Sequence, residues 1–295
     1  MAGTQTEALH EAAKGLDERP RVEIASLLAE GQIRAATSLR EALDGIAGGS
    51  AAMAKSIREG GALHYVAAGS SGLMAAADAQ ELGGTFSIPT HQIFIHMAGG
   101  LPTGPEMPGD TEDEIGDLEQ SLSGLSSKDT VIAVSASGTT PYTMAAVELA
   151  KAKGAAIIAI ANNPNVPLFE KADYEICLAT PPEVLSGSTR MGAGTAQKIA
   201  LNMLSTLMAV DLGHVHDGMM VNVRADNAKL QARAAGIVSQ IAGVDQAHAN
   251  SALKQAEGDV KPAILIAAKG IPSDAARDVL GETNGNLRAA LARLT

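Results

Sequence analysis

The chain has 295 residues and a formal net charge of −11, from 22 Lys and Arg against 33 Asp and Glu. This excess of acid argues against nucleic acid or an anionic lipid surface as a partner. The N-terminus is not a basic start followed by an apolar run, and no uninterrupted apolar stretch of about 18 residues occurs. We therefore expect a soluble, cytoplasmic protein that does not engage a membrane.

The core is expected to be aliphatic. Hydrophobic residues make up 46% of the chain but aromatic residues only 2%. The single cysteine, Cys177, lies in an apolar run and is expected to be a core residue rather than a nucleophile.

Residues 5–60 are predicted to form helices. An amphipathic pattern covers residues 21–47, and we expect Gly48-Gly49-Ser50 to break it. The segment is interpreted as a packing arm.

The middle of the chain alternates strands with helices. Five short apolar runs bounded by turn residues predict strands at 62–67, 91–97, 130–134, 155–161 and 174–179. Helical patterns lie between and after them, at 73–82, 142–153 and 196–208. Near-continuous apolar strands that alternate with helices indicate an α/β fold, with a parallel five-stranded sheet covered by helices on both faces.

Three loops rich in serine, threonine and glycine follow strands and open helices. The first is Gly69-Ser70-Ser71-Gly72, the second covers residues 135–141, and the third covers 181–198. Each combines short side chains, hydroxyl donors and the N–H groups of a helix start, which suits an anion or a polyhydroxylated ligand. The candidate binding residues are Ser70, Ser71, Gly72, Ser135, Ser137, Thr139, Thr140, Glu183, Ser186, Ser188, Thr189 and Arg190.

These loops favour a sugar or a sugar phosphate over a nucleotide. None has the Gly-Lys-Ser/Thr of a phosphate-binding P-loop or the Gly-x-Gly-x-x-Gly of a dinucleotide site. Ligands of parallel sheets bind at the carboxyl ends of the strands, where all three loops are expected to lie. The alternative for the third loop is a Ser/Thr helix cap with glycines.

Three glutamates lie near these loops. Glu81 has small apolar neighbours and is expected to be partly desolvated, which would suit proton exchange; the alternative is an exposed glutamate in the last helical turn. Glu112 lies in an acidic stretch that could be a solvated face, and Glu183 precedes the third loop. Five histidines, His64, His91, His96, His214 and His216, are candidates for opening a sugar ring, although a structural role is the simpler interpretation and their spacing indicates no metal site.

The last part of the chain changes character. A helix is predicted at 223–241, and the segment around Gly258 then resembles the segment around Gly285. Two short helix-turn-helix units would explain the repeat. We therefore expect an N-terminal arm at 1–60, a sheet domain at 61–241 and a small helical domain at 242–295.

The run from Ser186 to Thr206 resembles the signature of the N-acetylmuramic acid 6-phosphate etherases and the related glucokinase regulatory proteins. The resemblance covers about residues 20–295. The motifs that continue it are Gly69-Ser70-Ser71-Gly72, the segment 78–81, Ala98-Gly99-Gly100, the segment 136–142, Asn163-Pro164, the segments 220–223 and 227–231, and the C-terminal repeat. It implies a flavodoxin-like sugar isomerase (SIS) domain, a small tail similar to a ubiquitin-associated domain, and a homodimer with sites at the subunit interface.

The resemblance also implies a chemistry that needs no metal or redox cofactor. In the family, the ring of the amino-sugar phosphate opens, the proton at carbon 2 is removed, the lactyl ether at carbon 3 leaves, and water adds. N-acetylglucosamine 6-phosphate and lactate result. The two catalytic glutamates of the family correspond here to Glu81 and Glu112.

Three basic residues that are usual in the family are replaced here by Leu73, Thr139 and Gly192. The loss of these cations weakens the inference that the site binds a phosphate through charge. Backbone N–H groups, hydroxyls and Arg190 could still donate hydrogen bonds to a phosphate. Two alternatives stay open. One is an aldose/ketose isomerase of sugar phosphates, and the other is a regulator that binds the sugar phosphate without turnover.

Overall fold

A computed structural model describes residues 5–108, 111, 115–223 and 228–294. The chain divides into two compact units. The first contains the N-terminal helices and the sheet, within residues 1–79 and 91–205; the second contains residues 80–90 and the chain from 206 onward. Among the described residues, no helix is long and apolar enough to cross a membrane.

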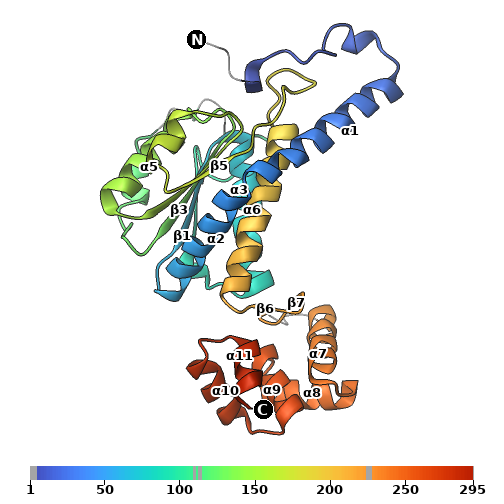
Figure 1. Ribbon diagram of the computed structural model, residues 1–295. Helices are drawn as coiled ribbons and strands as arrows, with labels where there is room; N and C mark the ends of the chain where they lie inside the picture. The colour runs from blue at the N-terminus through green and yellow to red at the C-terminus, as the bar shows by residue number, and fades with distance from the viewer. Residues whose placement is uncertain (1–4, 109–110, 112–114, 224–227, 295) are drawn as a thin grey trace. The chain divides into compact units, whose positions relative to one another are not determined.

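The sheet of the first unit has five parallel strands in the order β2-β1-β3-β4-β5 (Figure 1). The strands are β1 (Leu63–Ala67), β2 (Ile93–Met97), β3 (Thr130–Ser135), β4 (Ala156–Ala161) and β5 (Tyr174–Cys177). All five predicted strands are confirmed within one to two residues. In register, Ala67 at the end of β1 lies between Met97 of β2 and Val134 of β3, so the strands end at one edge of the sheet.

Helices cover both faces of this sheet. The α-helices of this part of the chain are α1 (Arg21–Thr37), α2 (Leu43–Arg58), α3 (Gly69–Phe86), α4 (Leu118–Ser121), α5 (Pro141–Lys153) and α6 (Gly192–Asp211). Short 3-10 turns occur at Gln5–Glu7, Leu16–Glu18, Ser38–Glu41, Thr90–Gln92 and Pro167–Lys171. One face packs on α4 and α5, through alternate side chains such as Val66, Val131 and Ile157. The α/β class predicted from the sequence is confirmed.

The predicted break at Gly48-Gly49-Ser50 is wrong, because these residues lie inside α2. The helix is interrupted earlier, at the 3-10 turn Ser38–Glu41. The glycines serve close packing instead. A Cβ atom on Gly48 would lie 2.7 Å from the ring of Tyr174, and one on Gly49 would lie 3.1 Å from Ile158. Glycine at these positions lets α2 approach the sheet closely.

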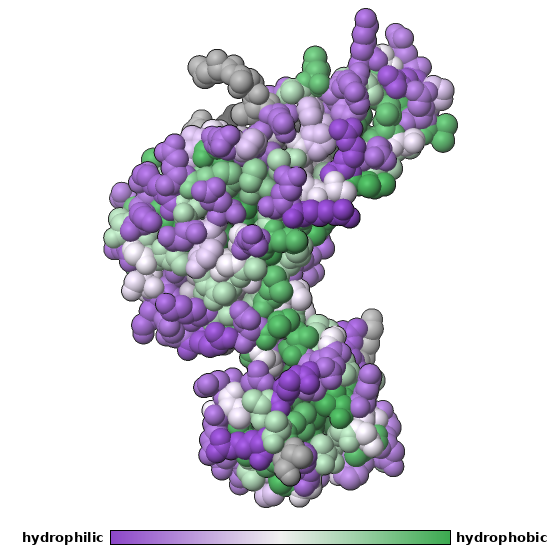
Figure 2. Space-filling model, in the orientation of Figure 1, coloured by the Kyte–Doolittle hydropathy of each residue, from purple (hydrophilic) through white to green (hydrophobic). Residues whose placement is uncertain are grey.

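Helix α1 is largely uncovered in the single chain. Of its seventeen residues only Ala35 is buried, and Val22 and Ile33 are 78% and 60% exposed. Figure 2 shows hydrophobic residues interrupting the hydrophilic surface in this part of the molecule. Large apolar side chains left in water are typical of a surface that another chain covers.

The second unit is mostly helical. Its elements are the two-residue strands β6 (Val215–His216) and β7 (Met219–Met220), and the helices α7 (Ala228–Ala242), α8 (Gln246–Gln255), α9 (Val260–Lys269), α10 (Ser273–Glu282) and α11 (Leu287–Arg293). Helices α7 to α11 share one core of aliphatic residues around α9, whose residues 260–267 are all buried. The helix predicted at 223–241 is confirmed from residue 228 onward, and its first residues lie partly outside the described ones.

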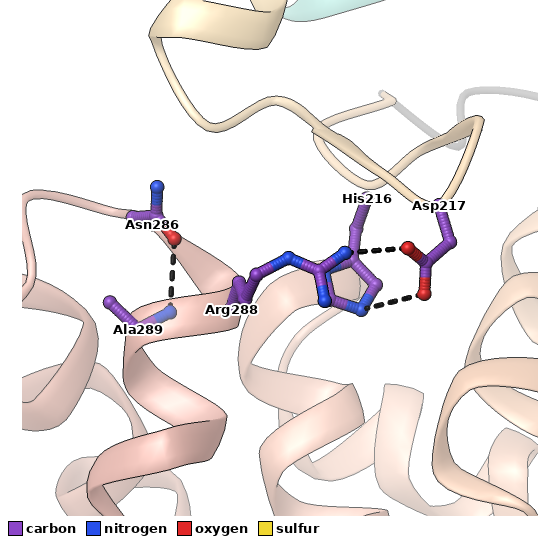
Figure 3. Close-up of polar contacts among 5 residues, drawn as sticks. All are labelled: His216, Asp217, Asn286, Arg288 and Ala289. Atoms are coloured by element: carbon purple, nitrogen blue, oxygen red, sulfur yellow. Dashed lines mark hydrogen bonds and ion pairs between the residues drawn. The ribbon is translucent and has the colours of Figure 1, made fainter.

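The repeat around Gly258 and Gly285 is confirmed as two helix-turn-helix units. Both glycines have a left-handed backbone, with φ of 93° and 71°. Gly258 directly precedes Asp259, the N-cap residue of α9, and Gly285 directly precedes Asn286, the N-cap residue of α11. The side chain of Asn286 accepts a hydrogen bond from the Ala289 N–H at 3.0 Å, which caps α11 (Figure 3).

An ion pair between Asp217 and Arg288 connects the β6–β7 hairpin to α11. The carboxylate of Asp217 accepts a hydrogen bond from Arg288 at 2.5 Å and lies 3.5 Å from Nε2 of His216 (Figure 3). The Arg288 bond lowers the pKa of Asp217. Burial and the Arg288 charge lower the pKa of His216 against the raising effect of Asp217.

Candidate functional site

A pocket of about 240 Å³ lies where β1 and β3 end. It is lined by residues of all three loops that the sequence singles out, together with residues of the N-terminal segment: Thr6, Glu7, Ala68, Ser70, Ser71, Ser135, Ala136, Ser137, Thr140, Gly187 and Thr189. Six of the twelve predicted binding residues therefore line one cavity. Its lining is dominated by hydroxyl groups.

The second loop contributes a network of hydroxyls. Ser135 Oγ lies 2.8 Å from Thr140 Oγ1 and 3.3 Å from Ser137 Oγ, and it accepts the Gly138 N–H at 3.0 Å. Gly138 has a φ of 76°, and a Cβ atom there would lie 2.4 Å from Val166. Glycine is thus needed for the turn that brings these hydroxyls together.

The first loop contributes the start of α3. Ser70 and Ser71 lie in the first turn of this helix, whose leading N–H groups have no acceptor within the helix. Gly72 does not line the pocket. A Cβ atom on it would lie 2.8 Å from Met97, so this glycine allows α3 to pack against the end of β2.

The start of α6, which the third loop was expected to open toward a ligand, is capped by a side chain of that same loop. The Glu183 carboxylate, 7% exposed, accepts the Gly192 N–H at 3.0 Å and the Ala193 N–H at 2.8 Å. This acidic side chain therefore caps α6 and occupies helix-start N–H groups that were expected to face a ligand. Glu183 itself is not among the pocket-lining residues.

The remaining predicted binding residues lie outside the pocket lining. Thr139, Ser186 and Arg190 are exposed, and Ser188 is half-buried. The Thr139 hydroxyl donates to Ser137 Oγ at 3.1 Å and so supports the second loop.

Sequence reasoning missed the N-terminal wall of the pocket. The Thr6 N–H donates to Asn163 Oδ1 at 3.3 Å, and Asn163 Nδ2 donates to Thr6 Oγ1 at 3.1 Å. Asn163 directly follows the residue after β4, and its Nδ2 also donates to the Ala136 carbonyl at 3.0 Å. The available signal was Asn163, an amide side chain just after the end of β4. Nothing in the sequence around it indicates that its partner is Thr6, which is 157 residues away.

The two predicted catalytic glutamates have different outcomes. Glu81 lies on α3 and is exposed in the single chain, which differs from the partial desolvation expected from its neighbours. Glu112 lies outside the described residues. The turn before Glu81 is firmly held, because buried Asp78 accepts hydrogen bonds from Tyr65, Asn202 and Ser205 at 2.8–2.9 Å.

The Asp78 cluster joins β1, α3 and α6. Burial raises the pKa of Tyr65 well above its ordinary value, and the charge of Asp78 adds to this effect. Tyr65 therefore remains a neutral donor, and the carboxylate is stabilised by three hydrogen bonds rather than left unpaired in the core.

None of the five candidate histidines lines the pocket. His64 Nδ1 and His96 Nε2 lie 3.0 Å apart in stacked rings, so one of the two nitrogens carries the shared proton. Burial lowers the pKa of His96 to about 4, with His64 adding to the effect, and burial also lowers the pKa of His64. Both rings are thus neutral, structural side chains at neutral pH. In the part of the chain that the structure describes, no three His, Cys, Asp or Glu side chains gather as a metal site would need.

A larger pocket of about 760 Å³ lies within the second unit, but its charges are committed to the fold. Arg277 pairs with Asp259 at 2.7 Å and with Glu257 at 3.5 Å. Lys261 donates to the Gly285 carbonyl at 2.8 Å, and burial lowers its pKa to about 8. We assign the candidate site to the smaller pocket because three sequence motifs converge there.

Comparison with known proteins identifies the family. The SIS domain family matches residues 106–211. Over 99% of this chain, the sequence is 36% identical to N-acetylmuramic acid 6-phosphate etherase 1 of Enterococcus faecalis, covering 98% of that protein. It is 39% identical to the N-acetylmuramic acid 6-phosphate etherase of Streptomyces avermitilis over 97% of this chain and 93% of that one.

Solved structures share the fold at lower identity. A Bacteroides fragilis protein described as a phosphosugar isomerase involved in capsule formation has 21% identity and a TM-score of 0.50, covering 64% of this chain and 90% of its own. That likeness supports the SIS-type sheet alone. The full-length relatives carry the assignment further: the chain belongs to the N-acetylmuramic acid 6-phosphate etherase family.

Proposed function

We propose that the protein is a carbon–oxygen lyase that cleaves the lactyl ether of N-acetylmuramic acid 6-phosphate, giving N-acetylglucosamine 6-phosphate and D-lactate. The observation that carries the proposal is the near full-length identity of 36–39% to etherases. A cytoplasmic setting and a place in cell-wall amino-sugar recycling remain predictions.

The pocket supports binding of the phosphorylated end of the sugar. Ser70, Ser71, Ser135, Ser137 and Thr140 present hydroxyls, and the first turn of α3 presents N–H groups. Hydroxyls and helix-start amides together can satisfy phosphate oxygens without a lysine or arginine.

In the proposed reaction, a glutamate removes the proton at carbon 2 of the open-chain sugar. The aldehyde stabilises the resulting enolate, the bond between carbon 3 and the ether oxygen breaks, and lactate leaves with a proton. Water then adds at carbon 3 of the unsaturated aldehyde. We assign the proton transfers to Glu81 and Glu112. No step requires a metal or redox cofactor.

We propose that the active protein is a homodimer with sites at the subunit interface. Glu81 follows Ser71 by ten residues on α3, which corresponds to roughly 15 Å along the helix axis. A carboxylate at that distance suits a sugar held by a second copy better than one held in the same chain's pocket. The exposed apolar side chains of α1 also favour a partner.

The test is lactate release from N-acetylmuramic acid 6-phosphate by the purified protein, compared with the Glu81→Gln variant. We expect a loss of about 100-fold or more in kcat for this variant, because a positioned general acid or base contributes at least that much. Glu59→Gln, which changes an exposed glutamate at the end of α2, serves as the control and should keep full activity.

Absence of lactate from the wild-type protein would contradict the proposal. Interconversion of sugar-phosphate isomers without lactate would then identify an isomerase. Binding of the sugar phosphate without any turnover would identify a regulator.

A further inference from the structure

The described lining of the 240 Å³ pocket carries one charge, and that charge is negative. Among its described lining residues the single charged side chain is Glu7, and no lysine or arginine is present. Arg190, the nearest arginine in sequence to the third loop's lining residues, is exposed and outside the lining. A bound phosphate would therefore meet neutral donors and one carboxylate.

Glu7 is an exposed residue of the pocket lining, and the backbone beside it is fixed to the pocket. It ends the 3-10 turn Gln5–Glu7, and the preceding residue, Thr6, is 2% exposed. Thr6 exchanges two hydrogen bonds with Asn163, which is itself bonded to the second loop. On the other side, Glu7 Oε2 lies 3.7 Å from the Cβ position of Gly187 in the third loop.

We infer that Glu7 is a specificity-determining residue, which lowers the preference of this site for a 6-phosphorylated sugar over the same sugar with a free 6-hydroxyl. The inference rests on the proposed function, in which this pocket receives the carbon 6 end of the substrate. A carboxylate repels a phosphate dianion, whereas it accepts a hydrogen bond from a hydroxyl.

The preference is measured as the ratio of kcat/KM for N-acetylmuramic acid 6-phosphate to kcat/KM for N-acetylmuramic acid. Glu7→Gln removes the charge at nearly constant shape, and we expect the ratio to rise about tenfold. Glu7→Lys adds a positive charge and should raise the ratio further. The order of the three proteins, Lys above Gln above wild type, is the signature of a direct charge effect.

Glu11→Gln is the matched control. It removes one negative charge from the same exposed N-terminal segment, outside the pocket lining, and should leave the ratio at the wild-type value. A ratio that is unchanged or lower in Glu7→Gln would overturn the inference, as would an equal rise in the Glu11→Gln control.

A second measurement separates this inference from the proposed function. Calorimetric binding of N-acetylglucosamine 6-phosphate and of N-acetylglucosamine needs no turnover. The ratio of the two affinities, phosphorylated over unphosphorylated sugar, should again be highest for Glu7→Lys and lowest for the wild type. This order without any lactate release would support the role of Glu7 and contradict the etherase proposal. Lactate release together with the same ratio in all three proteins would support the etherase proposal and overturn the role of Glu7. Failure to bind either sugar would also overturn the inference.

Discussion

The His64–His96 pair shows how single residues couple this fold to pH. In the folded chain the pKa of His96 is about 4, below the ordinary value of 6.5, chiefly because the ring is withdrawn from water. Between pH 6.5 and 4 the unfolded chain therefore binds a proton that the folded chain does not. Stability should decrease as the pH falls through this window.

We predict that His96→Gln reduces this pH sensitivity. In the wild type, His96 alone should lower the free energy of unfolding by about 2 kcal/mol between pH 7 and pH 5. Urea unfolding at the two pH values should show a decrease that is smaller by about this amount in the variant. His248→Gln, at an exposed position on α8, should behave as the wild type does; an equal change in both variants would contradict the prediction.

At the scale of elements, the turns between helices depend on backbone that only glycine adopts easily. Gly285 has a φ of 71° between α10 and α11, whereas Gly236 lies within α7 with open space around its Cβ position. Gly285→Ala should lower the free energy of unfolding by about 1–2 kcal/mol. Gly236→Ala should raise it by about 0.5–1 kcal/mol, because alanine is the better helix former.

The opposite signs of these two glycine changes can be read from thermal or urea unfolding of the full chain. Two changes of the same sign would show that the turn around Gly285 does not require its left-handed conformation.

The elements that the sequence predicts well are those with a strong local signal. Buried parallel strands are continuous apolar runs, and β3 and β4 are buried along nearly their whole length. The loops after β1 and β3 were likewise predictable, because serine and glycine follow each strand after a single alanine. The hairpin turn Asp217-Gly218 also has a local signal in its Asp-Gly sequence, and both residues have positive φ, 46° and 77°.

The features that the sequence does not predict depend on distant partners. Gly48 and Gly49 have the composition of a helix break, yet Tyr174 and Ile158 make them packing residues. Glu183 resembles a ligand contact until the N–H groups of Gly192 and Ala193 are seen to bind it. Tertiary structure overrides local preference in both cases.

At the scale of the whole molecule, the proposed homodimer makes a direct prediction. Light scattering after size exclusion should give about 60 kDa, twice the 30.0 kDa of one chain. Ile33→Glu places a charge on the exposed apolar side of α1 and should shift the protein toward the monomer. Ile33→Met keeps the apolar contact and should remain dimeric.

A wild-type protein that elutes as a 30.0 kDa monomer at micromolar concentration would contradict the dimer. The domain boundaries predicted at residues 60 and 241 stay a prediction that limited proteolysis can examine.

The packing of α2 against β5 has a consequence for synthesis. Gly45 on α2 meets the backbone of Glu175 so closely that a Cβ atom would lie 2.1 Å from its carbonyl oxygen. At translation rates of 5–20 residues per second, α2 leaves the ribosome on the order of ten seconds before its partner strand exists. We therefore expect the nascent chain to hold an uncovered apolar helix through most of the synthesis of the sheet, and to be most exposed to chaperones and proteases in that interval.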